Sequence, residues 1–354
     1  MNHVNCSLLS AAFLLAAVPL NGLAGGSSGC SAESPLASGV YSMSFDGLER
    51  TYRVHVPKGH NPDEPAPLVA VFHGWGGNEN GYLDVPLVRE GADKHGYIIV
   101  APRGLGSGEP DGHNNSWSFR GSNTGIDGNG DATCDVELTP EYRYNSCRAS
   151  GMAKNLCAWT HCQGTHETDV EFVLAMLEEV SGKLCVDKDR VFATGSSNGG
   201  MLTWELGQNP TSASTLRAIA PNIGLPHRGY LDGPPKGAEM PAFLMTGTAD
   251  ATVPPGEWEN FGFTTTSDGD RFYYASASAI TRVWADAMGC STDEPATPVD
   301  TGVKEIDCRS YCGEDEGLPR VLDCRANMGH ESGLSWSWEL TLDFFDAHSV
   351  TPPP

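Results

Sequence analysis

The feature of this 354-residue sequence that most constrains its fold is a Gly-x-Ser-x-Gly pattern at residues 195–199. It lies in the run VFATGSSNGGMLTWEL, where an apolar strand leads into a glycine-flanked turn and then into a helix-like stretch. A turn this tight leaves no room for neighbouring side chains and presents its central residue above the sheet, at the start of the helix. The pattern therefore predicts an exposed nucleophile at Ser197, with Ser196 packed beside it. A second copy at residues 25–29 has neither strand nor helix around it, and we assign it no role.

The apolar runs along the chain predict an α/β fold with a mostly parallel central sheet and helices on both faces. Two stretches near the N-terminus, 41–45 and 51–56, are β-like, and the second alternates polar and apolar residues. The later runs are short and continuously apolar, as is typical of strands covered on both sides. Apolar residues at helical spacing over 169–180 predict one covering helix. The predicted buried strands are residues 68–72, 97–100, 191–193, 216–220, 242–245 and 320–322.

Residues 104–164 interrupt this pattern, being rich in Gly, Asn, Asp and Cys with few apolar runs. We expect a disulfide-tied insertion near the top of the sheet, where long loops usually carry function. Within it, Asp127 to Asp131 resembles the start of a calcium loop, with side-chain oxygens at alternate positions. Ala132 stands where such loops carry Gly and no Glu closes the loop, so a solvated turn is the preferred interpretation. No metal site and no cofactor are predicted.

Residues 1–24 are typical of a secretory signal peptide. The apolar run Leu8–Leu20 is too short to span a bilayer, and small residues at 22–24 offer a cleavage site. A buried N-terminal helix is the alternative. The chain has eleven cysteines, and cleavage would remove Cys6, leaving ten. An even number in an exported chain predicts disulfides, and no pair has the Cys-x-x-Cys spacing of a zinc site. We therefore predict a secreted protein with one domain over residues 25–354.

The charge balance excludes some classes of partner. There are 22 basic and 45 acidic residues, which gives a net charge of −23. A surface this negative repels nucleic-acid phosphates and anionic lipid headgroups, so neither nucleic acid nor a membrane is predicted as a partner. A neutral substrate is compatible with the charge. The sequence predicts no oligomeric state.

A serine nucleophile needs a base, and the base needs an acid that orients it. Beyond the first acidic candidate the chain has two histidines, and His330, after a strand and a turn, is preferred to His348, which we expect to lie at the surface. Asp250 ends an apolar strand that runs into a Gly/Thr turn. Asp323 also follows a strand, but it is too close in sequence to His330 to come from a separate one. Ser197, Asp250 and His330 are the predicted catalytic residues.

The oxyanion formed by attack on a carbonyl group needs two aimed N–H groups. One is predicted to be the backbone N–H of Asn198, directly after the nucleophile. The other should come from the glycine-rich turn HGWGG at residues 73–77. We prefer the Trp75 amide, with Gly74 and Gly76 as close alternatives. His73 is expected to buttress this turn.

At these residues the chain resembles the secreted feruloyl esterases and polyhydroxybutyrate depolymerase-like esterases of carbohydrate esterase family 1, an α/β-hydrolase group. The segments PLVAVFHGWGGN, CVDKDRVFATGSSNGG, GTADATVP, CRSYCGEDEGLPRVLDC and MGH match in order and span most of residues 30–340. The resemblance implies a Ser-Asp-His triad on Ser197, Asp250 and His330, within a catalytic domain. It also implies ester substrates, either hydroxycinnamates linked to plant xylan or hydroxyalkanoate polyesters.

Several interpretations remain open beside the preferred one, a feruloyl esterase. A polyester depolymerase or general carboxylesterase is the main alternative, and an acyltransferase or a non-catalytic binding protein is an alternative of another class. After His330 the chain reads ESGLSWSWEL, where the family carries a Trp-Pro pair, and this departure concerns the substrate side. Trp75, Trp117 and Trp159 are candidates for lining a pocket or for packing. The cysteines expected to brace the His330 loop with two bridges, in unspecified pairing, are Cys290, Cys308, Cys312 and Cys324.

Overall fold

The computed structural model describes residues 25–107, 113–120, 125–126, 132–133, 169–267, 271–312 and 320–349. The predicted signal peptide, the possible calcium loop at 127–131 and Trp159 lie outside these residues. No helix in the described ranges combines the length and the apolar character needed to cross a membrane.

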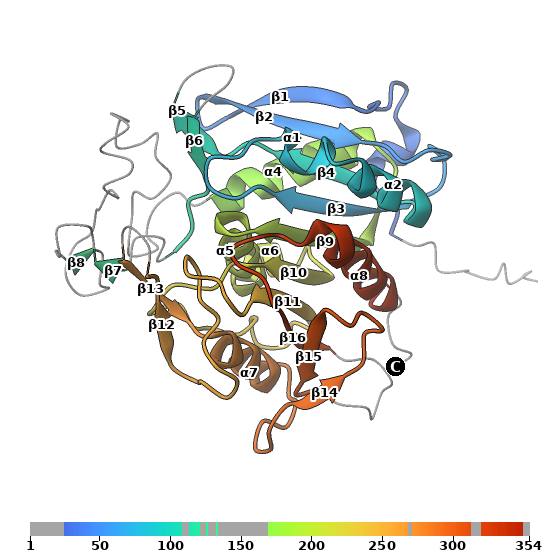
Figure 1. Ribbon diagram of the computed structural model, residues 1–354. Helices are drawn as coiled ribbons and strands as arrows, with labels where there is room; N and C mark the ends of the chain where they lie inside the picture. Colours follow the sequence, from blue (N-terminus) through green and yellow to red (C-terminus); the bar gives the residue numbers. More distant parts are fainter. Residues whose placement is uncertain are drawn as a thin grey trace, which may run out of the picture.

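A ten-stranded sheet forms the centre of the molecule (Figure 1). Its six middle strands are parallel, as the continuously apolar runs predicted, and an antiparallel pair closes each edge. The pair at the C-terminal edge was not predicted from the sequence. In spatial order the strands are β1 (Gly39–Phe45), β2 (Leu48–His55), β4 (Ile98–Pro102), β3 (Ala66–Phe72), β9 (Val186–Ser196), β10 (Ala218–Asn222), β11 (Ala242–Gly247), β16 (Val321–Ala326), β15 (Ile306–Ser310) and β14 (Thr297–Val299).

Helices cover both faces of the sheet, as predicted. One face packs against α4 (Asp169–Lys183), α5 (Asn198–Gln208) and α7 (Ala277–Ala287). The other face packs against α2 (Pro86–His95) and α8 (Leu334–Ala347), which contact each other. The short helices are η1 (Ser28–Ser31), α1 (Asn80–Leu83) and α6 (Pro210–Ala213).

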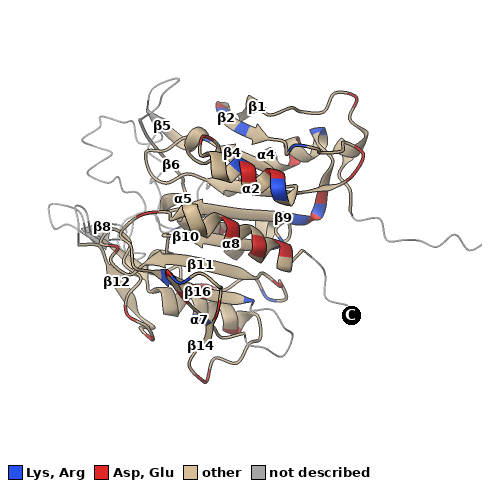
Figure 2. Cartoon of the chain, turned by 45° about the vertical axis from the view of Figure 1, so that its right-hand side comes forward, with Lys and Arg blue, Asp and Glu red and all other residues tan. Residues whose placement is uncertain are grey.

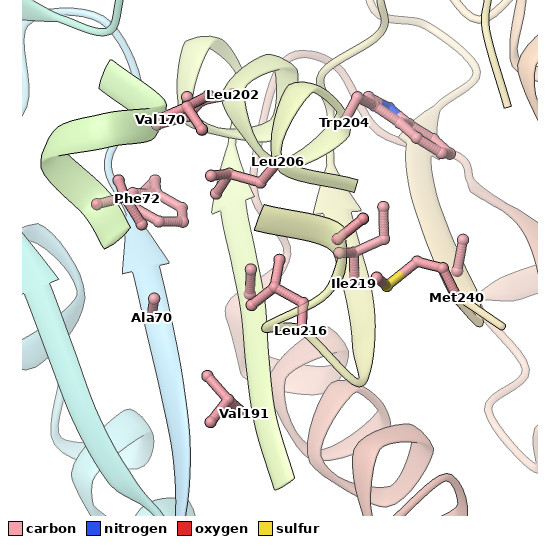
Figure 3. Close-up of a cluster of buried hydrophobic side chains, with 14 of the residues drawn as sticks. Ala70, Phe72, Val170, Val191, Leu202, Trp204, Leu206, Leu216, Ile219 and Met240 are labelled. Carbon is pink, nitrogen blue, oxygen red and sulfur yellow. The ribbon is translucent and has the colours of Figure 1, made fainter. Parts of the chain in front are cut away.

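Each parallel strand contributes side chains to two separate cores, because successive residues of a strand point to opposite faces. In β3, Phe72 packs into the core beneath α5, whereas Val71 packs into the core beneath α8. Figure 3 shows part of the first core, with Phe72 on β3 and Leu202 and Leu206 on α5. This double burial explains why the strands are apolar at every position rather than at every second one.

Four short strands come from the predicted insertion at 104–164. β5 (Leu105–Ser107) pairs with β6 (His113–Ser116), and β7 (Gly125–Ile126) with β8 (Ala132–Thr133) joins β12 (Phe263–Thr265) and β13 (Arg271–Ala275) in a four-stranded sheet. The insertion is anchored where it leaves and rejoins the fold. There Asp169 accepts the Ser118 N–H at 2.7 Å and pairs with buried Arg50 at 2.7 Å. The insertion's cysteines, Cys134, Cys147, Cys157 and Cys162, lie outside the described residues.

Three disulfides join described residues. Cys30–Cys185 ties the N-terminal segment to the start of β9, although the two cysteines are 155 residues apart. Cys290–Cys312 and Cys308–Cys324 confirm the two predicted bridges and settle their pairing. The second bridge joins neighbouring strands β15 and β16, and β16 leads directly toward His330.

Candidate active site

Ser197 occupies a strained turn between β9 and α5. Its backbone has φ 56° and ψ −120°, a conformation that residues other than glycine rarely adopt. A side chain on Gly199 would place its Cβ 2.2 Å from the Phe72 carbonyl oxygen, and one on Gly195 would lie 2.5 Å from the Gly199 carbonyl oxygen. The glycines of the pattern are therefore required by the close approach of β3 and α5. Ser196 packs away from the turn, with its Oγ 2.6 Å from the hydroxyl of buried Tyr82.

An unbroken hydrogen-bond chain connects Ser197, His330 and Asp250. The Ser197 Oγ lies 2.8 Å from His330 Nε2, and His330 Nδ1 lies 2.7 Å from Asp250 Oδ2. These residues are 133 and 80 positions apart in sequence. They meet because β9, β11 and β16 are parallel, so the loops after their carboxyl ends lie at one edge of the sheet.

The Asp250 side chain is fully buried, and backbone groups hold its carboxylate in place. Its Oδ1 accepts N–H bonds from Thr252 and Val253, both at 2.8 Å, while Oδ2 faces His330. Because each oxygen has a separate set of donors, the carboxylate cannot rotate without breaking one of them. This arrangement fixes the ring of His330 with a proton on Nδ1 and a lone pair on Nε2 toward Ser197.

The two sequence alternatives occupy other environments. Asp323 is buried and its carboxylate pairs with Arg325, at 2.7 Å and 3.0 Å, and burial raises the pKa of Asp323 above its ordinary value. His348 lies at the C-terminal end of α8 and is 7% exposed, with its ring 4.6 Å from that of Phe344. The expectation of a surface histidine was therefore wrong, because the end of α8 packs its ring against the helix.

The glycine-rich turn 73–77 lies beside the nucleophile. A Cβ on Gly74 would be 3.4 Å from the Cβ of Ser197, so this position must stay small for the two segments to approach. The Gly76 N–H donates to the Asn115 carbonyl at 2.8 Å and is therefore already engaged. As the first residue of α5, Asn198 has an N–H without an acceptor inside the helix. The Trp75 side chain is 41% exposed.

His73 supports this turn as a neutral side chain. Its Nε2 accepts the Gly104 N–H at 2.9 Å, so the proton must be on Nδ1, which donates to the Gly74 carbonyl at 2.7 Å. Burial lowers the pKa of His73 to about 4. The indole N–H of Trp117 donates to the His73 carbonyl at 2.8 Å, and Trp117 is fully buried, so it belongs to the core beneath the turn.

One group of described side chains has the spacing of metal ligands. The ligand atoms of His95, Glu339 and Asp343 lie within 4.8 Å of one another on α2 and α8, where Figure 2 shows acidic residues on α8. Lys94 forms an ion pair with Glu339, and Asp346 Oδ2 lies 2.6 Å from His95 Nδ1. We interpret the group as an ion-pair network between two helices. It includes none of the residues around Ser197.

Asn222, which belongs to no motif of the sequence, contacts residues beside both Ser197 and His330. Its backbone carbonyl accepts the Ser197 N–H at 2.9 Å, and its side chain donates to the Ser332 carbonyl at 2.7 Å. The available sequence feature was a polar residue two positions after the predicted buried strand 216–220, on the edge of the sheet where the catalytic loops lie.

The order of the strands and the helices on both faces of the sheet define an α/β-hydrolase fold. The chain is also a distant homologue of the fungal feruloyl esterases. It is 24% identical over 234 residues to "Probable feruloyl esterase C" of Aspergillus flavus, covering 64% of this chain and 63% of that protein. It is 24% identical over 241 residues to "Feruloyl esterase D" of Neurospora crassa, covering 68% and 67%. The chain thus spans 63% of the length of the Aspergillus flavus relative.

A solved structure of a fungal esterase has a similar fold. The acetyl xylan esterase from Aspergillus awamori superimposes with a TM-score of 0.50 at 14% sequence identity, over 87% of this chain and 99% of that one. At this identity the likeness concerns the fold. No protein-family model matches the sequence.

Proposed function

We propose that this chain is a secreted serine carboxylesterase, and that its substrates are feruloyl-type esters of plant cell-wall polysaccharide. The observation that carries the proposal is the hydrogen-bond chain from Ser197 Oγ through His330 to buried Asp250. The homology to proteins named feruloyl esterases supports the choice of ester and of acyl group.

In the proposed reaction, Ser197 Oγ attacks the ester carbonyl while His330 Nε2 takes its proton. Asp250 stays ionised and stabilises the imidazolium that forms. The tetrahedral intermediate then collapses, and His330 returns the proton to the leaving alcohol, which leaves an acyl group on Ser197. Water, activated by the same histidine, releases the acid in a second round.

The negative oxygen of the intermediate would be held by the N–H groups of Asn198 and Trp75. Asn198 starts a helix whose dipole adds to the effect. The Gly76 N–H is not proposed as a donor, because it already binds the Asn115 carbonyl. The half-exposed Trp75 indole would offer an apolar face to an aromatic acyl group.

The disulfide bonds of the chain support the proposal that it is secreted. Three disulfides among the described residues require an oxidising compartment to persist. The predicted signal peptide at 1–24 would deliver the chain to such a compartment.

A substrate panel tests the proposal. We expect the purified protein to hydrolyse methyl ferulate and to release ferulate from arabinoxylan, without clearing a polyhydroxybutyrate suspension. Replacing Ser197 with Ala should reduce turnover of every active ester at least ~10³-fold while leaving the thermal unfolding curve in place. If the protein clears the polyester and does not act on methyl ferulate, it is a polyester depolymerase and not a feruloyl esterase. If ester turnover survives Ser197→Ala, Ser197 is not the nucleophile.

A further inference from the structure

We propose that Asn222 is a positioning residue that holds the His330 loop at the correct distance from Ser197. The inference rests on the proposed function, because it assigns Asn222 a role in the same reaction. Asn222 ends β10, which lies between β9, the strand that leads to Ser197, and β11, the strand that leads to Asp250.

Asn222 contacts the two sides of the triad through different atoms. Its backbone carbonyl accepts the Ser197 N–H at 2.9 Å, which ties the strained turn to the neighbouring strand. Its side-chain Nδ2 donates to the Ser332 carbonyl at 2.7 Å, and Ser332 lies two residues after His330. One residue therefore connects the nucleophile to a loop 110 positions further along the chain.

The His330 loop has a separate anchor on its other side. The Met328 carbonyl, two residues before His330, accepts the Ala249 N–H at 3.0 Å, next to Asp250. That bond fixes the loop to the acid, whereas the Asn222 bond fixes it to the strand beside the nucleophile. The bond from Ala249 to Met328 does not involve the segment that contains Ser197. The distance from His330 Nε2 to Ser197 Oγ therefore depends on the bond from Asn222 to Ser332.

The orientation of the Asn222 amide is determined by its partner. A carbonyl oxygen can only accept, so Nδ2 must face Ser332, and this leaves the Oδ1 atom buried without a hydrogen-bond partner among the described residues. The Oδ1 atom itself is shielded from bulk solvent. A buried amide oxygen without a hydrogen-bond partner lowers the stability of the fold. What Asn222 contributes is the N–H group that donates to the His330 loop.

Removing this donor should affect catalysis more than folding. The Ser332 carbonyl also accepts the Ser337 Oγ at 3.0 Å, so it keeps one partner when Asn222 is replaced. The loop would stay folded, but the position of His330 relative to Ser197 would no longer be fixed. A displacement of about 1 Å at the base can lower a rate about 100-fold.

The experiment compares Asn222→Leu with Thr194→Val. Leu has a similar shape without the donor, and the backbone bond to Ser197 remains. Thr194 is also buried, on β9, and its hydroxyl donates to the Ala220 carbonyl of β10 at 2.6 Å, so Val removes a buried hydrogen bond near Asn222 without touching either catalytic loop. Hydrolysis of p-nitrophenyl acetate gives kcat and KM, a fluorophosphonate probe gives the rate of Ser197 labelling, and thermal unfolding gives stability.

We expect Asn222→Leu to lower kcat and the labelling rate about 10- to 100-fold with KM within about threefold, and Thr194→Val to keep both rates near wild type. Unchanged rates in Asn222→Leu, or equal losses in both variants, would overturn the role. If the Leu variant does not fold, Asn222→Ala is measured against the same control. Failure of the proposed function is a separate result: wild type would then show no turnover that depends on Ser197.

Discussion

Replacing Asp250 with Asn is the sharpest test of how the site works, because the surrounding backbone dictates the outcome. Thr252 and Val253 both point N–H groups at one carboxylate oxygen, each at 2.8 Å. The carbonyl oxygen of the new amide must accept these bonds, and its NH₂ group must therefore face His330. His330 Nδ1 then has to accept, which moves the ring proton to Nε2, where it blocks proton transfer from Ser197.

The expected loss follows from this change of tautomer. An imidazole in the wrong tautomer costs about 10⁴-fold in kcat, which corresponds to about 5 kcal/mol of barrier at about 1.4 kcal/mol per factor of ten. Stability should change little, since the side chain keeps its shape and its two backbone bonds. Initial rates on methyl ferulate and urea unfolding measure the two quantities on the same preparation.

Asp323→Asn is the matched control, because Asp323 is also a buried acid, within the parallel strand β16. It should leave the rate of the folded enzyme near wild type but reduce the free energy of unfolding by about 3–5 kcal/mol, since buried Arg325 loses its counter-charge. The reasoning would be refuted if Asp250→Asn kept more than a tenth of wild-type kcat, or if the folded Asp323 variant were the inactive one.

Two further predictions concern histidines outside the triad. The pKa of His73 is about 4 in the folded chain and ordinarily 6.5, so neutral His73 contributes stability that is fully present above pH 6.5 and is lost as the pH falls toward 4. Urea unfolding should show the advantage of wild type over His73→Gln shrinking by about 3 kcal/mol between pH 7 and pH 4, and a constant difference would contradict the shift. His348→Ala should keep kcat within about twofold. It should lower the free energy of unfolding by about 1 kcal/mol, because the His348 ring packs on Phe344. If the variant folds but is inactive, His348 and not His330 is the base.

Local sterics explain why much of the architecture could be predicted. A run that is apolar at every position is buried on both sides, so the central strands and the helix over 169–180 were located closely, with α4 running from Asp169 to Lys183. The edge strands β14 and β15 were missed because β14 has only three residues, one of them proline, and β15 has five residues without a continuous apolar run. The choice of Asp250 over Asp323 needed an argument about which strand each residue follows, since in the sequence both come directly after a predicted strand, although the structure places Asp323 within β16.

By itself, the sequence determined the turn at Ser197, because the glycines that permit it stand beside the serine and the steric demand is local. Only the tertiary structure decided which acid faces His330, how the four C-terminal cysteines pair, and that Asn222 connects both sides of the site. These contacts join residues between 16 and 110 positions apart. They depend on the order and register of parallel strands, which no short stretch of sequence specifies.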